Sequence, residues 1–130
     1  MRKPRKQTWS NEMAGRIICL PIFFRLPGLR KVQAIALWPF IFIRDARSQS
    51  DRVLLRHEAI HLRQQLELCV IPFYLIYLGE FLWHMVRGKN GHMAYRSISF
   101  EREAYRFETV EGYLQDRPLF ASFRLGKSGM

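Results

Sequence analysis

Residues 68–86 form an almost entirely apolar segment of 19 residues, interrupted by Glu80 and His84. A transmembrane helix needs about 20 mostly apolar residues, so the segment has nearly the length of a membrane span. Glu80 would cost up to about 3 kcal/mol near the centre of a bilayer, which the apolar residues could offset. The segment is therefore either a membrane span or a core helix, and the sequences that flank it decide between the two.

An H-E-x-x-H motif, His57-Glu58-x-x-His61, lies before this segment. The surrounding residues 49–69 are rich in Leu, Arg, Glu and Gln, which favour a helix. On a helix, side chains four residues apart share a face, so both imidazoles can bind one metal ion. Neutral imidazole suits zinc, and Glu58 lies beside the pair, where it can act as general base toward a metal-bound water. The motif therefore predicts a Zn²⁺ site.

A third ligand must come from elsewhere in the chain. The metzincin motif would continue with Gly and His on the same helix, but Gln64 and Glu67 occupy those positions. A downstream glutamate is the other common ligand, and residues 99–108 offer a helix rich in Glu and Arg. On that helix Glu101 shares one face with Ala104, Tyr105 and Glu108, whereas Glu103 points elsewhere.

The motif followed by Glu101-x-x-Ala104 resembles the gluzincin zinc peptidases, whose third ligand lies in a Glu-x-x-(Ala/Ser)-Asp helix. The segment 101–107 is similar to the third-ligand helix of the small ImmA/IrrE-type metallopeptidases, and the wider string resembles small uncharacterised bacterial H-E-x-x-H proteins. This resemblance implies a zinc ion held by His57, His61 and Glu101, with Glu58 as the catalytic base.

The sequence departs from the gluzincin pattern at one position and leaves one role open. Tyr105 stands where many gluzincins have Asp or Asn to orient a ligand histidine. Tyr95 is our candidate for stabilising a tetrahedral intermediate. Of the two other histidines, we expect His84 to be a hydrogen-bonded core residue and His92 to be solvated.

The metal site and a membrane span are close to mutually exclusive. Only the segment 68–86 separates His61 from Glu101, so a single span would place these two residues on opposite sides of the membrane. Nineteen residues are too few for a spanning hairpin. If the site is real, the segment is a core helix or lies in the membrane interface with Tyr77 and Trp83 near the headgroups.

The remaining pattern predicts an α+β fold, with a short β ribbon or small sheet followed by about three helices. Residues 16–43 are rich in β-branched and aromatic side chains, and Pro39 indicates that the run from residue 32 is an edge strand or contains a bulge. An extended substrate could pair with the strand Ala36–Ile43. The H-E-x-x-H helix would face the helix that carries the third ligand.

We expect helix boundaries from capping residues, Pro and Gly. Ser48 caps a first helix over residues 49–69, a second ends at Val86, and a third runs from an N-cap at Ser99 to about Gly112. The predicted organisation is a flexible basic arm (1–15), one zincin-like minimal domain (16–115) and a C-terminal tail (116–130). The predicted core residues are Leu54, Ile60, Leu62, Leu66, Phe73, Ile76, Phe81, Phe100 and Phe107.

The chain is strongly basic, with 21 Lys and Arg against 11 Asp and Glu and a net charge of +10. An anionic membrane surface, nucleic acid and simple solvation are all compatible with this charge. Nucleic acid is disfavoured, because the sequence has no zinc-finger spacing and no ribonucleoprotein motif. The surroundings of Cys19 and Cys69 predict buried free thiols, and no secretory signal is visible. We therefore expect a cytoplasmic protein, with peripheral contact at the inner membrane left open.

These observations favour a zinc-dependent metallopeptidase that hydrolyses a peptide or protein substrate with metal-activated water. A second hypothesis keeps the zinc without catalysis: the metal stabilises a small domain whose basic face docks on a membrane or nucleic acid, with Glu103 or His92 closing the fourth coordination position. A third is a small single-span membrane protein in which the motif occurs by chance.

Overall fold

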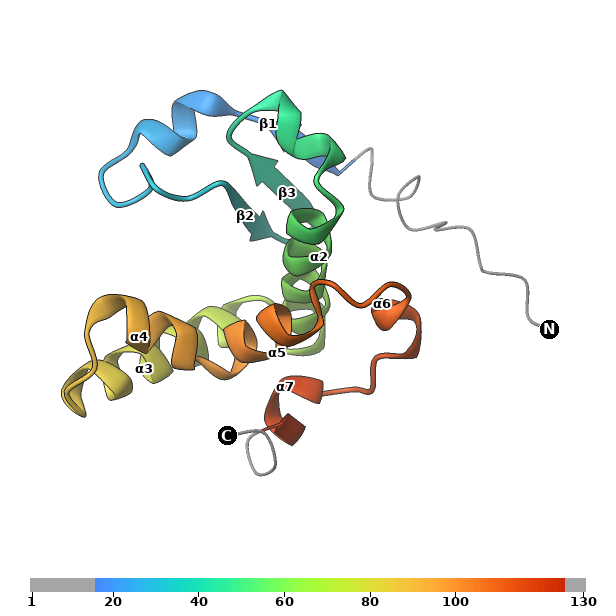
Figure 1. The fold of residues 1–130 in the computed structure, drawn as a ribbon. Coiled ribbons are helices and arrows are strands. Elements are labelled where there is room, and N and C mark those ends of the chain that lie inside the picture. The colour runs from blue at the N-terminus through green and yellow to red at the C-terminus, as the bar shows by residue number, and fades with distance from the viewer. Residues whose placement is uncertain (1–15, 126–130) are drawn as a thin grey trace.

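The computed structural model describes residues 16–125 and has the expected α+β architecture. A small sheet comes first along the chain, and helices make up most of the remainder, as Figure 1 shows. The basic arm expected over residues 1–15 lies outside the described residues, as do residues 126–130.

The sheet has three strands, β1 (Ile17–Cys19), β2 (Ala34–Leu37) and β3 (Phe40–Ile43), in the order β1-β3-β2. β1 is parallel and β2 antiparallel to β3. The single strand expected over Ala36–Ile43 is wrong: Pro39 lies in the tight turn between β2 and β3, since it has no N–H to give to a ladder. Within residues 16–125, β3 is therefore the central strand, and β2 is the edge strand that packs on α2.

The helix that bears the motif is α2 (Arg52–Glu67), three residues shorter at its start than the sequence predicted. Asp51 is its N-cap, because the Oδ1 atom of Asp51 accepts a hydrogen bond from the N–H of Leu54 at 3.0 Å. The predicted cap at Ser48 is wrong, and Ser48 instead belongs to a short 3-10 helix, η2 (Ala46–Ser50). Another 3-10 helix, η1 (Pro21–Arg25), follows β1.

The apolar segment forms α3 (Ile71–Val86), which ends where the sequence predicted. An additional short helix, α4 (Gly91–Ser97), begins at an Asn90 cap that accepts from the N–H of Met93. The third-ligand helix is α5 (Ser99–Phe107), with Ile98 as its N-cap, and it ends before the predicted Gly112. Two short helices, α6 (Tyr113–Asp116) and α7 (Ala121–Arg124), complete the described chain.

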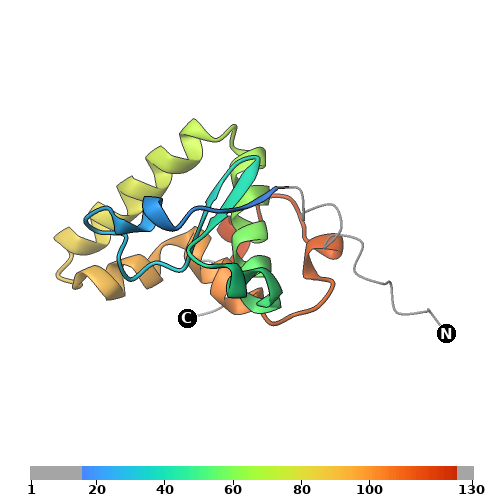
Figure 2. The ribbon, with the colours of Figure 1, turned by 90° about the horizontal axis from the view of Figure 1, so that it is seen from above.

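α2 stands between the sheet and the remaining long helices (Figures 1 and 2). One of its faces packs on the sheet, and the other faces α5. The first apolar cluster joins α2 to the sheet and comprises Ala34, Ala36, Ile41, Ile43, Leu55 and Leu62. The second joins α3 to α5 through Phe73, Ile98 and Phe100. α2 and α5 are thus held side by side, which brings the motif and the third-ligand candidate together.

Most of the predicted core residues are buried or partly buried, and Leu66 is the exception, with 54% of its surface exposed. The two residues before Leu66, Gln64 and Gln65, are buried instead. Their amides bond to groups on β2 and α5, so polar side chains occupy this part of the interior. Burial of polar groups is tolerated when they are hydrogen-bonded in this way.

Two further expectations need correction. Cys19 and Cys69 are free but exposed, not buried, because Cys19 ends an outer strand and Cys69 lies at the bend between α2 and α3. The segment assigned to a C-terminal tail is folded in part: Ala121 and Ser122 of α7 are buried, and the Arg117 side chain is only 4% exposed.

Within residues 16–125, no single helix has both the length and the apolar character of a membrane span. α2 and α3 together satisfy the length and composition criteria, but the chain bends by 113° between them.

Candidate metal centre

The three predicted ligands meet at one buried point between α2 and α5. The Oε1 atom of Glu101 lies 3.0 Å from Nε2 of His57 and 3.0 Å from Nε2 of His61. The two Nε2 atoms are 3.2 Å apart, and all three side chains are buried. One turn of α2 supplies both imidazoles, and the first turn of α5 supplies the carboxylate.

The outer nitrogen of each imidazole is fixed by an acceptor. Nδ1 of His57 lies 2.7 Å from Oε2 of Glu108, and Nδ1 of His61 lies 2.8 Å from Oε1 of Gln64. Because a carboxylate and an amide oxygen only accept hydrogen bonds, each Nδ1 carries the proton. In the neutral tautomer this leaves the Nε2 lone pair of both rings directed at the centre. Such outer hydrogen bonds orient histidine ligands in metal sites.

The spacing of the three ligand atoms fits a metal ion. Metal–ligand bonds of about 2.0–2.1 Å at a tetrahedral centre place neighbouring ligand atoms about 3.3 Å apart. The 3.0–3.2 Å separations at this site are close to that value. Two imidazole lone pairs and a carboxylate oxygen repel one another unless a cation lies among them. The His57, His61 and Glu101 group can therefore hold a metal ion.

The protonation states of His61 and Glu101 without a metal also indicate that this group favours a positive charge at its centre. Burial alone would lower the pKa of His61, but the Glu101 carboxylate and its hydrogen bond raise that pKa to about 9. Burial alone would raise the pKa of Glu101, but the charge of His61 holds that pKa well below its usual range. Without a metal, a proton on His61 thus supplies the positive charge that the carboxylate requires.

Glu58, the predicted base, lies beside this group and not within it. Burial raises the pKa of Glu58 to about 7, against the opposing charges of His61 and His57. The backbone of Ala36 on β2 also opposes this rise in the pKa. A carboxyl group whose pKa lies near neutral pH can both accept and return a proton, as general acid–base catalysis requires.

Two cavities meet at Glu58. The first, of about 310 Å³, contains Glu58, His61 and Glu101 on one wall and is otherwise mainly apolar. Its apolar lining includes Leu29, Val32, Ile35, Phe73, Tyr74 and Tyr77. The second, of about 510 Å³, is more polar and exposes His57, Glu58 and Glu108 together with Lys31, Asp51 and His92. The two cavities share the lining residues Val32, Ala34, Glu58 and Tyr95, so they adjoin beside the candidate metal site, and together they are called the cleft below.

β2 forms one wall of this cleft, but part of its edge is already occupied. The carbonyl of Ala36 accepts hydrogen bonds from Gln65 Nε2 at 2.9 Å and from the Tyr74 hydroxyl at 2.9 Å. The N–H of Trp38 donates to Gln65 Oε1 at 2.7 Å. By the alternation of the ladder, Ala34 also directs its backbone groups away from β3. An extended peptide could therefore pair with β2 at Ala34 and not along the range that the sequence predicted.

Three tyrosines surround the ligands. The Tyr77 hydroxyl of α3 donates to Oε2 of Glu101 at 2.8 Å, which leaves Oε1 for the metal. The Tyr105 ring packs edge-on against His57, with 4.5 Å between ring centroids. Tyr95 of α4 lines both cavities, and its hydroxyl lies 2.9 Å from that of Tyr105. Burial and the nearby Glu101 charge raise the pKa of Tyr95, so its hydroxyl keeps a proton to donate.

Glu103 does not point to solvent or to the metal group. Its side chain is completely buried, where it pairs with Arg117 and accepts from the Tyr113 hydroxyl at 2.8 Å. Gln64 Nε2 also donates to Oε1 of Glu103 at 3.1 Å, which fixes the amide that orients His61. Glu103 is therefore committed to a polar network behind the site and does not supply a fourth ligand.

The other histidines lie outside the ligand group formed within residues 16–125. His92 is exposed on α4 and lines the polar cavity, in agreement with the expectation of a solvated residue. His84 is partly buried in the last turn of α3.

Comparison with known proteins returned no match to this chain among family models, curated proteins or solved structures. The functional interpretation therefore rests on the geometry of the site.

Proposed function

We propose that this protein is a zinc-dependent metallopeptidase. The observation that carries the proposal is the position of Glu58, which lies beside a three-ligand metal group and at the junction of the two cavities. A zinc site that only stabilises a fold is normally closed by four protein ligands. Here His57, His61 and Glu101 form the ligand group, and the cleft passes directly beside them.

Two imidazoles and one carboxylate are a ligand set typical of catalytic zinc. When bound, zinc lowers the pKa of a coordinated water toward neutrality and polarises a carbonyl group. In this chain Glu108 and Gln64 hold the ligand imidazoles in place, and Tyr77 orients the Glu101 carboxylate. These contacts fix the ligand geometry before substrate arrives, which is the condition for efficient catalysis.

Glu58 accepts a proton from the attacking water and passes it to the leaving amine. In the metal-free site burial raises the pKa of Glu58 to about 7, and a carboxyl group with a pKa near neutral pH can both take up and return a proton. Tyr95 is a neutral donor that lines both cavities, and it would donate a hydrogen bond to the oxygen that gains negative charge. Ala34 would pair with the backbone of the substrate, which extends through the cleft with one side chain in the apolar cavity.

The substitution Glu58→Gln tests the proposal, because it removes the base and retains the size of the side chain. The protein would be loaded with zinc and assayed against a fluorogenic library of unstructured peptides. We expect zinc content to be unchanged and hydrolysis to fall by about 10²–10⁴-fold, the usual contribution of a general base. Glu111→Gln is a matched control, because it makes the same chemical change at a side chain that is 70% exposed.

Three outcomes are distinguishable. Activity that is lost in Glu58→Gln and kept in Glu111→Gln supports the peptidase. Equal activity in wild type and Glu58→Gln removes Glu58 as the base. Zinc binding with no hydrolysis of any library member favours the alternative, a zinc site without catalysis.

A further inference from the structure

α3 has two different faces, and the fold uses only one of them. The inner face contributes Phe73 to the core, Tyr77 to Glu101 and Glu80 to the start of α5. Glu80 Oε1 accepts from both the N–H and the hydroxyl of Ser99, at 3.1 and 2.6 Å. The acidic residue that interrupts the apolar segment is thus turned inward and does not lie on the outer face.

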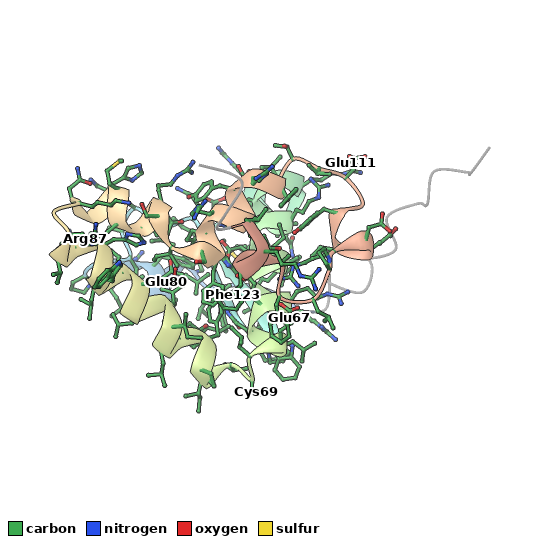
Figure 3. All side chains as sticks on the ribbon, turned by 90° about the horizontal axis from the view of Figure 1, so that it is seen from below. Glu67, Cys69, Glu80, Arg87, Glu111 and Phe123 are labelled. Atoms are coloured by element: carbon green, nitrogen blue, oxygen red, sulfur yellow. The ribbon has the colours of Figure 1, made fainter. Side chains whose placement is uncertain are left out.

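The outer face of α3 is a continuous apolar stripe. It consists of Ile71, Leu75, Leu78, Leu82 and Val86, which are 70%, 67%, 54%, 51% and 82% exposed. Their spacing of three or four residues places them along one side of the helix. Figure 3 shows side chains projecting from α3 away from the body of the protein, between the bend at Cys69 and Arg87. An exposed stripe of this size marks an interaction surface.

The residues at the end of the stripe indicate its partner. Trp83 is 58% exposed, and the Arg87 guanidinium lies 5.4 Å from the centre of its ring. Arg87 is the C-cap of α3, and exposed Lys89 lies two residues beyond it, so an exposed aromatic residue and two cations lie together at this end of the helix. Aromatic rings with a polar edge, next to basic side chains, favour the boundary between lipid tails and anionic headgroups.

Charge favours a lipid surface over a second copy of this chain as the partner of the stripe. Each chain carries a net charge of +10, so pairing two copies through α3 would bring two strongly positive bodies together. An anionic bilayer has the opposite charge and attracts nearby Lys and Arg by about 1 kcal/mol each. The stripe would then bury its leucines among the acyl chains.

We propose that the outer face of α3 docks this protein on the surface of an anionic phospholipid bilayer, with the helix axis parallel to the membrane. The inner-face bonds of Tyr77 and Glu80 keep α3 within the fold while the stripe enters the lipid. This inference does not depend on hydrolysis, because the stripe and the metal site use opposite faces of the helix.

The test is cosedimentation of the full chain with vesicles of phosphatidylcholine containing 30% phosphatidylserine, compared with phosphatidylcholine alone. The variant Leu75→Gln/Leu82→Gln removes two exposed leucines of the stripe. Val53→Gln/Val110→Gln is the matched control, because these residues are 39% and 44% exposed and lie outside α3. Circular dichroism of each variant verifies that the helices are retained.

We expect wild type and the control to bind the anionic vesicles, and the α3 variant to bind at least about tenfold more weakly. Binding should also weaken with added salt and be much weaker on neutral vesicles. Equal binding by wild type and the α3 variant would overturn the proposal, as would equal binding to both kinds of vesicle. Self-association that disappears in the α3 variant, without vesicle binding, would assign the stripe to a second copy.

Discussion

His57 and Glu108 are separated by 51 positions in the chain, yet Nδ1 of the histidine lies 2.7 Å from Oε2 of the glutamate. Glu108 follows the last turn of α5, seven residues after the ligand Glu101. The end of α5 therefore orients a ligand on α2, while the first turn of α5 supplies the third ligand itself. α5 and its C-cap residue thus supply the third candidate ligand and fix the tautomer of His57.

Removing the Glu108 carboxylate should weaken metal binding. We expect Glu108→Ala to lower zinc affinity by about 10–100-fold, because His57 loses the acceptor that directs Nε2 to the centre. Glu108→Gln keeps an oxygen acceptor and should lose less. Competition with a chromophoric chelator measures the zinc affinity of both variants, and Glu111→Ala serves as the control. An unchanged affinity in Glu108→Ala would show that His57 does not need this contact.

Zinc affinity should depend steeply on pH. Without metal, His61 has a pKa raised from 6.5 to about 9, so it holds a proton that zinc must displace. Affinity should therefore rise by about tenfold per pH unit between 6.5 and 9, with release of a proton. Titrations in buffers of different ionisation enthalpy count that proton. A flat affinity over this range would mean that His61 is already neutral.

The raised pKa of His61 also makes the stability of the metal-free protein fall as pH rises. A raised pKa stabilises the folded state fully below the unfolded value of 6.5, and this contribution is lost as pH passes through about 9. Glu58, raised from 4.5 to about 7, acts in the same direction at lower pH. Thermal unfolding in the presence of a chelator should therefore give a lower Tm at pH 9 than at pH 6.5, and a Tm independent of pH would contradict the assignment.

The buried Glu103–Arg117 pair should be essential to the fold. Arg117 also contacts Glu67 at 2.8 Å, and neither partner of the Glu103 pair is more than 4% exposed. Arg117→Met leaves two carboxylates without their cation and should destabilise the protein by about 3–5 kcal/mol in urea unfolding. Glu103→Gln combined with Arg117→Met should recover part of this loss. No recovery in the double variant would show that the pair is not coupled.

The candidate ligand group could be predicted because its signal is local. His57 and His61 are one helical turn apart, and Glu101 lies on an amphipathic helix whose small Ala104 permits close approach. The orienting groups were missed, although Glu108 shares the face of Glu101 and Gln64 is one turn from His61. Their partners depend on how α2 and α5 pack, which residue spacing alone does not determine.

The fold was predictable in class but not in its details. Leu66 was assigned to the core by its apolar character, yet Gln64 and Gln65 take the buried positions because their amides find partners. Pro39 indicated an irregular strand and in fact lies in the turn of a hairpin. Tertiary hydrogen bonds determined which residues of α2 are buried, and a turn determined where the strand is interrupted. Residue polarity alone predicts neither.

The central claim is that His57, His61 and Glu101 together bind one metal ion. The most direct test is the zinc content of purified protein, measured for wild type and for His57→Ala, Glu101→Ala and the control Glu111→Ala. We predict a single zinc ion per chain in wild type and control, and its loss or marked weakening in both ligand variants. A wild-type protein that binds no zinc even after zinc is added, or a Glu101→Ala variant that binds it as tightly as wild type, would contradict the three-ligand site.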